Sequence, residues 1–217
     1  MTPLEELAET MALLRGPGGC PWDAQQSHES LVRYLIEEAH ELVEAIETGD
    51  DAHMREELGD VLLQVVFHAD IARAEGRFDL DDVARALTEK LRRRHPHVFG
   101  DVEVAGADEV VANWDAIKAA EKADRTSLVD GIPPSLPSLQ RADKLLGRAE
   151  REGIVTSDAV ADAVGVAPAD DEVALGERLL ATVIAARAAG LDAERSLRGA
   201  IRGLEERIRE AEATERG

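Results

Sequence analysis

The chain has 217 residues, of which 44% are hydrophobic and only 3% aromatic, so its core must be built from aliphatic side chains, as packed helices are. The net charge of -20, from 45 acidic and 25 basic residues, argues against a nucleic-acid polymer as partner and favours a cation. A single cysteine excludes an internal disulfide, and no signal-like or membrane-spanning run is present, which predicts a cytoplasmic protein without a membrane partner.

Helical patterns follow one another along the first part of the chain. A Thr2 cap followed by Pro3 and Glu5 predicts a helix that ends near Arg15, before a glycine-rich break. Residues 20–27 are expected to form an ordered loop or short turn. Further helices are predicted over residues 30–47, 52–75, 79–94 and 108–123.

The later part of the chain is also helical by pattern. A proline-rich segment precedes predicted helices at residues 139–151, 171–189 and 192–213. No stretch shows the alternating β-branched pattern of a strand, so the predicted fold class is all-α. We expect a first domain at 1–124, a linker at 125–138 and a second domain at 139–217.

The helix predicted at 30–47 carries acids in an unusual place. Its apolar stripe consists of Leu31, Leu35, Leu42, Ala45 and Ile46. Glu38 falls in the middle of this stripe, and Glu41 lies on its edge one turn later. Carboxylates placed against a core are costly unless a cation or a hydrogen-bonding partner compensates them, so the pair indicates a binding site.

The next helix has a narrow polar seam along an otherwise apolar surface. The seam consists of His53, Glu57, Asp60, Gln64 and His68. One interpretation is that it is merely the solvent face of a core helix. The alternative is that Glu57 and Asp60, again three residues apart, face Glu38 and Glu41 across two antiparallel helices.

Four carboxylates without cysteine favour a hard cation, Mg²⁺ or Mn²⁺, over Zn²⁺. A di-iron site is an alternative, because Glu37 and His40 form a Glu-x-x-His pair. Such a site needs a second pair of this kind on another helix, whereas Glu57 is followed at that spacing by Asp60.

Basic residues end the helix predicted at 79–94. Its buried stripe is expected to contain Leu80, Val83 and Leu87. Lys90 and Arg94 continue that stripe, with Arg93 beside them, although bases at a helix C-terminus also complement the helix dipole. Carboxylates with a metal on one wall and cations on the facing wall would form a clamp for a polyphosphate.

With these motifs in view, the chain resembles the MazG nucleoside triphosphate pyrophosphohydrolases. The family's Glu-x-x-Glu, spacer, Glu-x-x-Asp pattern stands here as Glu38-Ala39-His40-Glu41 and Glu57-Leu58-Gly59-Asp60. Flanking matches are Gly19-Cys20-Pro21-Trp22-Asp23, Arg94-His95-Pro96-His97-Val98-Phe99-Gly100 and Trp114-Asp115 with Lys118. The resemblance covers residues 3–122.

The resemblance implies a helix bundle of the MazG type, usually a homodimer, that acts on nucleoside triphosphates. It assigns Mg²⁺ to Glu38, Glu41, Glu57 and Asp60, and phosphate binding to Lys90, Arg93 and Arg94. It places Trp114 and Lys118 near the nucleotide. His53 stands where the family commonly has a lysine. Trp22 is a further candidate for nucleotide stacking, although a loop aromatic is more often a plug for the core.

Residues 139–217 resemble a degenerate second copy of the same helical repeat. Glu57 corresponds there to Ala174, Asp60 to Glu177 and Lys90 to Gly203. Only Asp158 and Asp162 precede this copy in place of a Glu-x-x-Glu motif. We therefore expect the second domain to be non-catalytic.

The expected reaction is Mg²⁺-dependent attack of water at the α-phosphorus, with release of pyrophosphate and with Glu38 or Glu41 as the base. Ordinary or damaged nucleotides are possible substrates. One alternative is a relative that acts on a single substrate, dUTP or phosphoribosyl-ATP. Another is a non-catalytic acidic interaction module, which the second domain fits better than the first.

Overall fold

The computed structural model describes residues 1–121, 127–151, 153 and 171–215. Within these ranges every regular element is a helix and no β-strand occurs, which confirms the all-α prediction. No described helix combines the length and apolar character needed to cross a membrane. The chain divides into two compact units, Met1–Glu121 and Lys122–Gly217.

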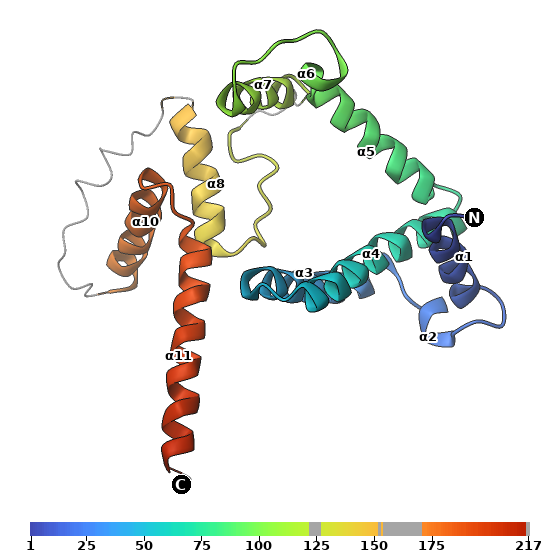
Figure 1. Cartoon of the computed structure of the whole chain (residues 1–217), viewed down its shortest axis with the longest axis horizontal. Helices are drawn as coiled ribbons and strands as arrows, with labels where there is room; N and C mark the ends of the chain where they lie inside the picture. The colour runs from blue at the N-terminus through green and yellow to red at the C-terminus, as the bar shows by residue number, and fades with distance from the viewer. Residues whose placement is uncertain (122–126, 152, 154–170, 216–217) are drawn as a thin grey trace. The chain divides into compact units, whose positions relative to one another are not determined.

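The first unit contains four long helices, one of intermediate length and two single turns (Figure 1). They are α1 (Pro3–Arg15), α2 (Pro21–Ala24), α3 (His28–Thr48), α4 (Asp51–Ala74), α5 (Leu80–Arg94), α6 (Pro96–Phe99) and α7 (Ala107–Ala120). The ends of the long helices lie close to the predicted ones. The single turn α6 was not predicted; it begins at Pro96, where the ring is tolerated because the first helical residue donates no hydrogen bond.

Local side chains explain where the helices begin and end. The Thr2 hydroxyl accepts from the Glu5 backbone while the Glu5 carboxylate accepts from the Thr2 backbone, the reciprocal cap predicted for α1. Gly49 ends α3 in a left-handed conformation with φ 75°, and Asp50 caps α4 immediately afterwards. The short turn makes α3 and α4 an antiparallel hairpin.

The hairpin of α3 and α4 is the most extensively packed pair in the first unit. At one end, α1 packs on α4 around a core of Met11, Leu31, Val66, Phe67 and Ile71. A buried ion pair fixes this contact: Arg15 Nε donates to Asp70 Oδ2 at 2.8 Å, and Arg15 Nη1 donates to the Asp23 carbonyl at 2.8 Å. The same arginine therefore ties α1 to both α4 and α2.

The helix α5 leaves the end of α4 and diverges from the hairpin toward α6 and α7 (Figure 1). The predicted stripe on α5 is only partly covered in the single chain: Leu80 packs against the core and Val83 is half-buried, whereas Leu87 is exposed. The hairpin likewise exposes apolar residues on both helices. These are Val32, Leu35 and Ile36 on α3, and Leu58, Leu62 and Val65 on α4. In one copy the first unit leaves these side chains partly exposed.

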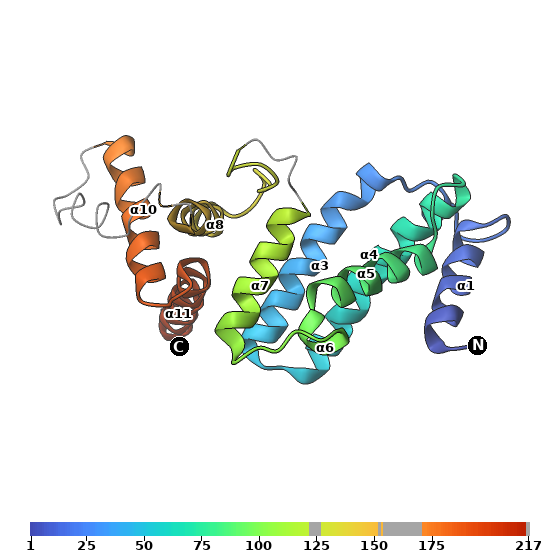
Figure 2. The same ribbon diagram turned by 90° about the horizontal axis from the view of Figure 1, so that it is seen from above.

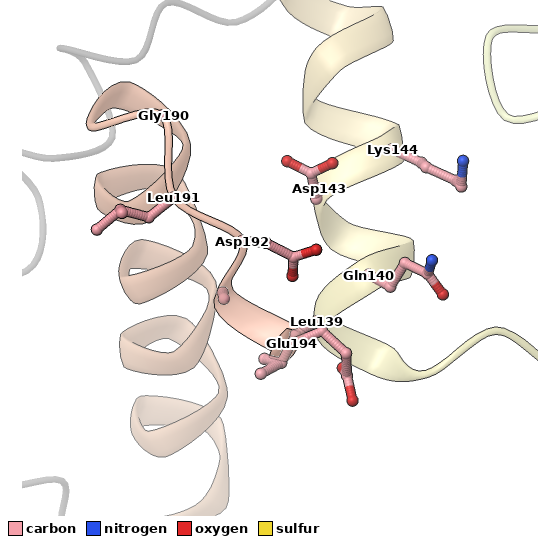
Figure 3. A pocket seen from close by; sticks show the side chains of 9 residues that line it. Leu139, Gln140, Asp143, Lys144, Gly190, Leu191, Asp192 and Glu194 are labelled. Atoms are coloured by element: carbon pink, nitrogen blue, oxygen red, sulfur yellow. The ribbon is translucent and has the colours of Figure 1, made fainter. Parts of the chain in front are cut away.

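The second unit contains α8 (Ser138–Arg151), α10 (Glu172–Ala188) and α11 (Ala193–Glu215), which contact one another around Leu146, Val183 and Ile184. Figure 2 views α8 and α11 nearly end-on beside α10. A cavity of about 260 Å³ lies between α8 and the turn from α10 to α11 (Figure 3).

The acids at this cavity already have partners. Asp143 accepts from Arg187, and Asp192 caps α11 by accepting from the Arg195 backbone N–H, both at 2.9 Å. The cavity therefore holds structural acids and none of the residues aligned with the first domain's carboxylates. Residues 125 and 126 of the predicted linker, and Asp158 and Asp162, lie outside the described residues.

Candidate metal and phosphate site

Three of the four predicted carboxylates meet between α3 and α4. Glu38 and Glu41 come from α3 and Glu57 from α4, and one oxygen of each lies within 4.8 Å of one oxygen of each of the others. Glu57 is buried, Glu38 is half-buried and Glu41 is exposed. The group is thus open at Glu41 and closed at Glu57, as a site that receives a ligand from solvent needs to be.

Asp60 lies outside this tight group but close enough to act on it. Burial raises the pKa of Glu38, and the negative charges of Asp60, Glu41, Glu57 and Glu37 raise it further. Asp60 is the largest of these charge contributions. The four predicted residues therefore share one electrostatic environment, in which like charges repel and a cation would relieve the repulsion.

The innermost oxygen of the group lacks a partner. Glu57 is only 5% exposed, and while its Oε1 lies 3.0 Å from His53 Nε2, its buried Oε2 has no hydrogen-bonding partner among the described residues. A buried carboxylate oxygen left in this way is unfavourable unless a ligand occupies its lone pairs. His53 thus contacts one of the three gathered carboxylates, that of Glu57.

The donor set fits a hard divalent cation. Every member of the group offers a carboxylate oxygen, the ligand that Mg²⁺ and Mn²⁺ prefer. The Glu-x-x-His pair that raised the di-iron alternative does not contribute, because Glu37 and His40 are exposed and neither belongs to the group.

The polar seam of α4 faces the protein and not the solvent. Glu57 and Gln64 are buried at 5% and 4% exposure, while Leu58 beside them is 52% exposed. The interpretation of the seam as the solvent face of a core helix is therefore wrong. In the single chain the polar side of α4 is turned inward and part of its apolar side outward.

The seam ends in a histidine pair that sequence reasoning missed. The Nδ1 atoms of His28 and His68 lie 2.7 Å apart with ring planes 3° from parallel, and Arg77 donates to His28 Nε2. Because arginine can only donate, neutral His28 carries its proton on Nδ1 and donates it to His68. Burial, followed by the neighbouring His28, lowers the pKa of His68. In the sequence, the one sign of His68 was its place in the regular spacing of polar residues along the seam.

The predicted phosphate-binding residues lie at the C-terminal end of α5. Lys90 and Arg93 are exposed and Arg94 is half-buried, with both arginines bonded to Glu121 after α7. Because α5 diverges from the hairpin, the single chain does not place this basic end on a wall facing the carboxylates (Figure 1). Sequence reasoning missed Glu121, which directly follows the last residue of α7, seven positions after Trp114.

The aromatic candidates occupy two places. Trp22 is 49% exposed and meets the Tyr34 ring edge-on at 5.8 Å, so it is not a plug for the core. Tyr34 lies one helical turn before Glu38 on α3. Trp114 is also exposed and lies 6.3 Å from the His95 ring, on the same helix as Lys118 and near the arginines.

The geometry thus offers two complementary clusters. An acidic group between α3 and α4 is suited to hold a divalent cation, and a basic and aromatic group at the α5–α7 end is suited to hold a phosphate and a base. The single chain does not join the two clusters into one site.

The chain is similar to several proteins whose names refer to nucleotide pyrophosphohydrolysis. The sequence profile described as "MazG nucleotide pyrophosphohydrolase domain" matches residues 26–99. The chain is 40% identical to the nucleoside triphosphate pyrophosphohydrolase of Escherichia coli (strain K12), over 98% of this chain and 88% of that one. It is 56% identical to the uncharacterised YabN protein of Bacillus subtilis over 61% of this chain, but spans only 27% of that longer protein. Among solved structures, a MazG-related protein from Thermotoga maritima matches with a TM-score of 0.45 and 30% identity, over 52% of this chain and 97% of that one.

Proposed function

Because the chain belongs to the MazG nucleotide pyrophosphohydrolase family, we propose that it hydrolyses nucleoside triphosphates to a monophosphate and pyrophosphate. The observation that carries this proposal is the group of Glu38, Glu41 and Glu57, with its one unpartnered buried oxygen. The name of the Escherichia coli relative describes the same reaction. Ordinary and damaged nucleotides both belong to the proposed substrate class.

The proposed cofactor is Mg²⁺, with Mn²⁺ as a substitute, held by Glu38, Glu41, Glu57 and Asp60. The support is the oxygen-only donor set and the mutual repulsion of these carboxylates. The ion supplies Lewis-acid stabilisation of the charge that develops on the phosphoryl oxygens and makes a nearby water a better nucleophile.

In the proposed reaction a water attacks the α-phosphorus, and the bond from that phosphorus to the oxygen bridging the β-phosphorus breaks. Glu38 or Glu41 accepts the proton that the water loses. Lys90, Arg93 and Arg94 neutralise the charge on the leaving pyrophosphate, while Trp22 or Trp114 stacks on the base and His53 and Lys118 supply further polar contacts.

We propose that the active form is a homodimer. The support is the uncovered apolar surface of α3, α4 and α5, which a soluble single copy would leave in contact with water. The second domain is proposed to be non-catalytic, since Ala174 and Gly203 lack the side chains of Glu57 and Lys90.

Product analysis tests the function. With a panel of Mg²⁺-nucleoside triphosphates that includes dUTP and oxidised bases, the wild type should release pyrophosphate; release of orthophosphate instead would show the proposal to be wrong. The Glu38→Gln variant should lose at least about a hundredfold in rate, since it removes a charge that acts on the transition state. Glu44→Gln, an exposed acid on the same helix, is the matched control and should retain wild-type activity.

A further inference from the structure

One carboxylate joins the two arginines at the end of α5. Glu121 Oε1 accepts from Arg93 Nε at 2.7 Å, and Glu121 Oε2 accepts from Arg94 Nε at 3.0 Å and from Arg94 Nη2 at 2.5 Å. The Arg94 and Glu121 side chains are only 13% and 19% exposed. Hydrogen bonds from Arg94 and then Arg93 lower the pKa of Glu121 to about 2, so this residue is charged at every pH of interest.

The contact leaves each arginine able to bind an anion. A guanidinium has five N–H donors in a fixed planar fork. Glu121 takes the Nε donor of Arg93 and the Nε–Nη2 edge of Arg94, and no other described residue accepts from the Nη groups of Arg93 or from Nη1 of Arg94. Two arginines and one carboxylate keep a net charge of +1, which still attracts a phosphate.

Without Glu121, the two arginines would lack a fixed geometry. They are consecutive residues in a helical turn that also contains Arg92, so three positive charges gather at the end of α5, and the Arg93 side chain is long and 56% exposed. A carboxylate held between both Nε atoms restricts both side chains before a ligand arrives. Pre-organisation of this kind strengthens binding because less side-chain freedom is lost when the ligand binds.

We propose that Glu121 is a positioning residue, which holds the guanidinium groups of Arg93 and Arg94 in the geometry that receives the phosphates of the substrate. The inference rests on the proposed function for the identity of the ligand. Glu121 itself does not touch the substrate; it acts through the two arginines, across the contact between α5 and α7.

The test compares Glu121→Gln and Glu121→Asp with the wild type in the full-length chain. Steady-state pyrophosphate release gives KM and kcat, and calorimetric titration with inorganic tripolyphosphate and Mg²⁺ measures anion binding without turnover. Asp101→Asn is the matched control, because it removes the same charge from an exposed position between α6 and α7.

We expect Glu121→Gln to raise KM and the dissociation constant for tripolyphosphate about tenfold, with a smaller change in kcat. A tenfold change corresponds to the loss of roughly one charge-assisted hydrogen bond. Glu121→Asp should recover part of the binding because its charge remains, and Asp101→Asn should stay within about twofold of the wild type, as an exposed charge does.

Tripolyphosphate binding by Glu121→Gln that is as tight as in the wild type would overturn the inference. Tighter binding would overturn it too, because Glu121 would then compete with the phosphate for the arginines. Loss of helical structure in Glu121→Gln with no recovery in Glu121→Asp would also overturn it, since the residue would then be only a structural link. If the wild type releases no pyrophosphate from any triphosphate, the proposed function fails. The tripolyphosphate titration then still decides the role of Glu121 in anion binding.

Discussion

Replacing Glu57 by glutamine should have two effects of opposite sign. Glu57 is the buried member of the carboxylate group, and one of its oxygens has no partner among the described residues. Glutamine keeps an oxygen for the His53 contact but removes one of the crowded negative charges. We therefore expect the variant to be more stable than the wild type without a cation, and to gain little of the stabilisation that the proposed Mg²⁺ site would give the wild type.

The size of both effects follows from the geometry. Two unit charges separated by the group's 4.8 Å repel by about 1 kcal/mol in water and about 3 kcal/mol at an effective dielectric constant near 20. For a chain of this length, each kcal/mol shifts the melting temperature by about 2–4 °C. The Glu57→Gln variant should thus melt about 2–12 °C above the wild type in EDTA. At a Mg²⁺ concentration of 100 times Kd the wild type should gain about 2.7 kcal/mol, and the variant much less.

Thermal unfolding followed by circular dichroism, in EDTA and in a Mg²⁺ series, measures both effects. Glu44→Gln controls for the removal of one acid from the same hairpin, and should leave the response to Mg²⁺ unchanged. A Glu57→Gln variant that melts below the wild type in EDTA would refute the proposed repulsion. A variant that gains as much from Mg²⁺ as the wild type does would refute the role of Glu57 in holding the ion.

Three further outcomes are expected. The pKa of His68 is lowered in the folded chain, so its contribution to stability is present above about pH 6.5 and is lost as the pH falls below that value. The free energy of unfolding in urea, measured between pH 8 and 5, should therefore fall more steeply for the wild type than for His68→Gln. Equal slopes for the two proteins would contradict this role of His68. Leu62→Lys places a charge on the uncovered face of α4 and should yield a monomer in sedimentation equilibrium, whereas an unchanged dimer would exclude this face from the interface. Asp70→Asn leaves Arg15 buried without its counter-charge and should lower the free energy of unfolding by about 3–5 kcal/mol; a loss below about 1 kcal/mol in urea unfolding would contradict the importance of this pair.

Sequence alone was sufficient for features that depend on neighbouring residues. The cap made by Thr2 and Glu5 and the stop at Gly49 act within a single turn, so their patterns are visible in the chain. The approach of Glu38 to Glu57 was also predictable, because two amphipathic helices joined by a short turn can pack in few ways. The metal and phosphate roles of these residues stay predictions.

Features that depend on distant residues were not predictable. The periodicity of α5 shows that it has an apolar face, but not how much of that face is covered within one chain, and the structure leaves Leu87 and Leu91 exposed. The partners of Arg94 and of His68 lie 27 and 40 residues away, and no local pattern selects Glu121 or His28 from the other acids and histidines. Such pairs follow from tertiary packing, which no local pattern in the sequence reveals.

The short turn between α3 and α4 has a consequence for the order of folding. All three gathered carboxylates lie between Glu38 and Glu57, so closing the site loops only a short stretch of chain and loses little entropy. The contact between Arg15 and Asp70 joins residues 55 positions apart and is slower to form. We expect the hairpin to form early, with its carboxylates already facing one another, so that a cation can bind a nascent hairpin before α1 docks. The free cation concentration during synthesis would then influence how fast the chain reaches its native state, as well as how fast it works.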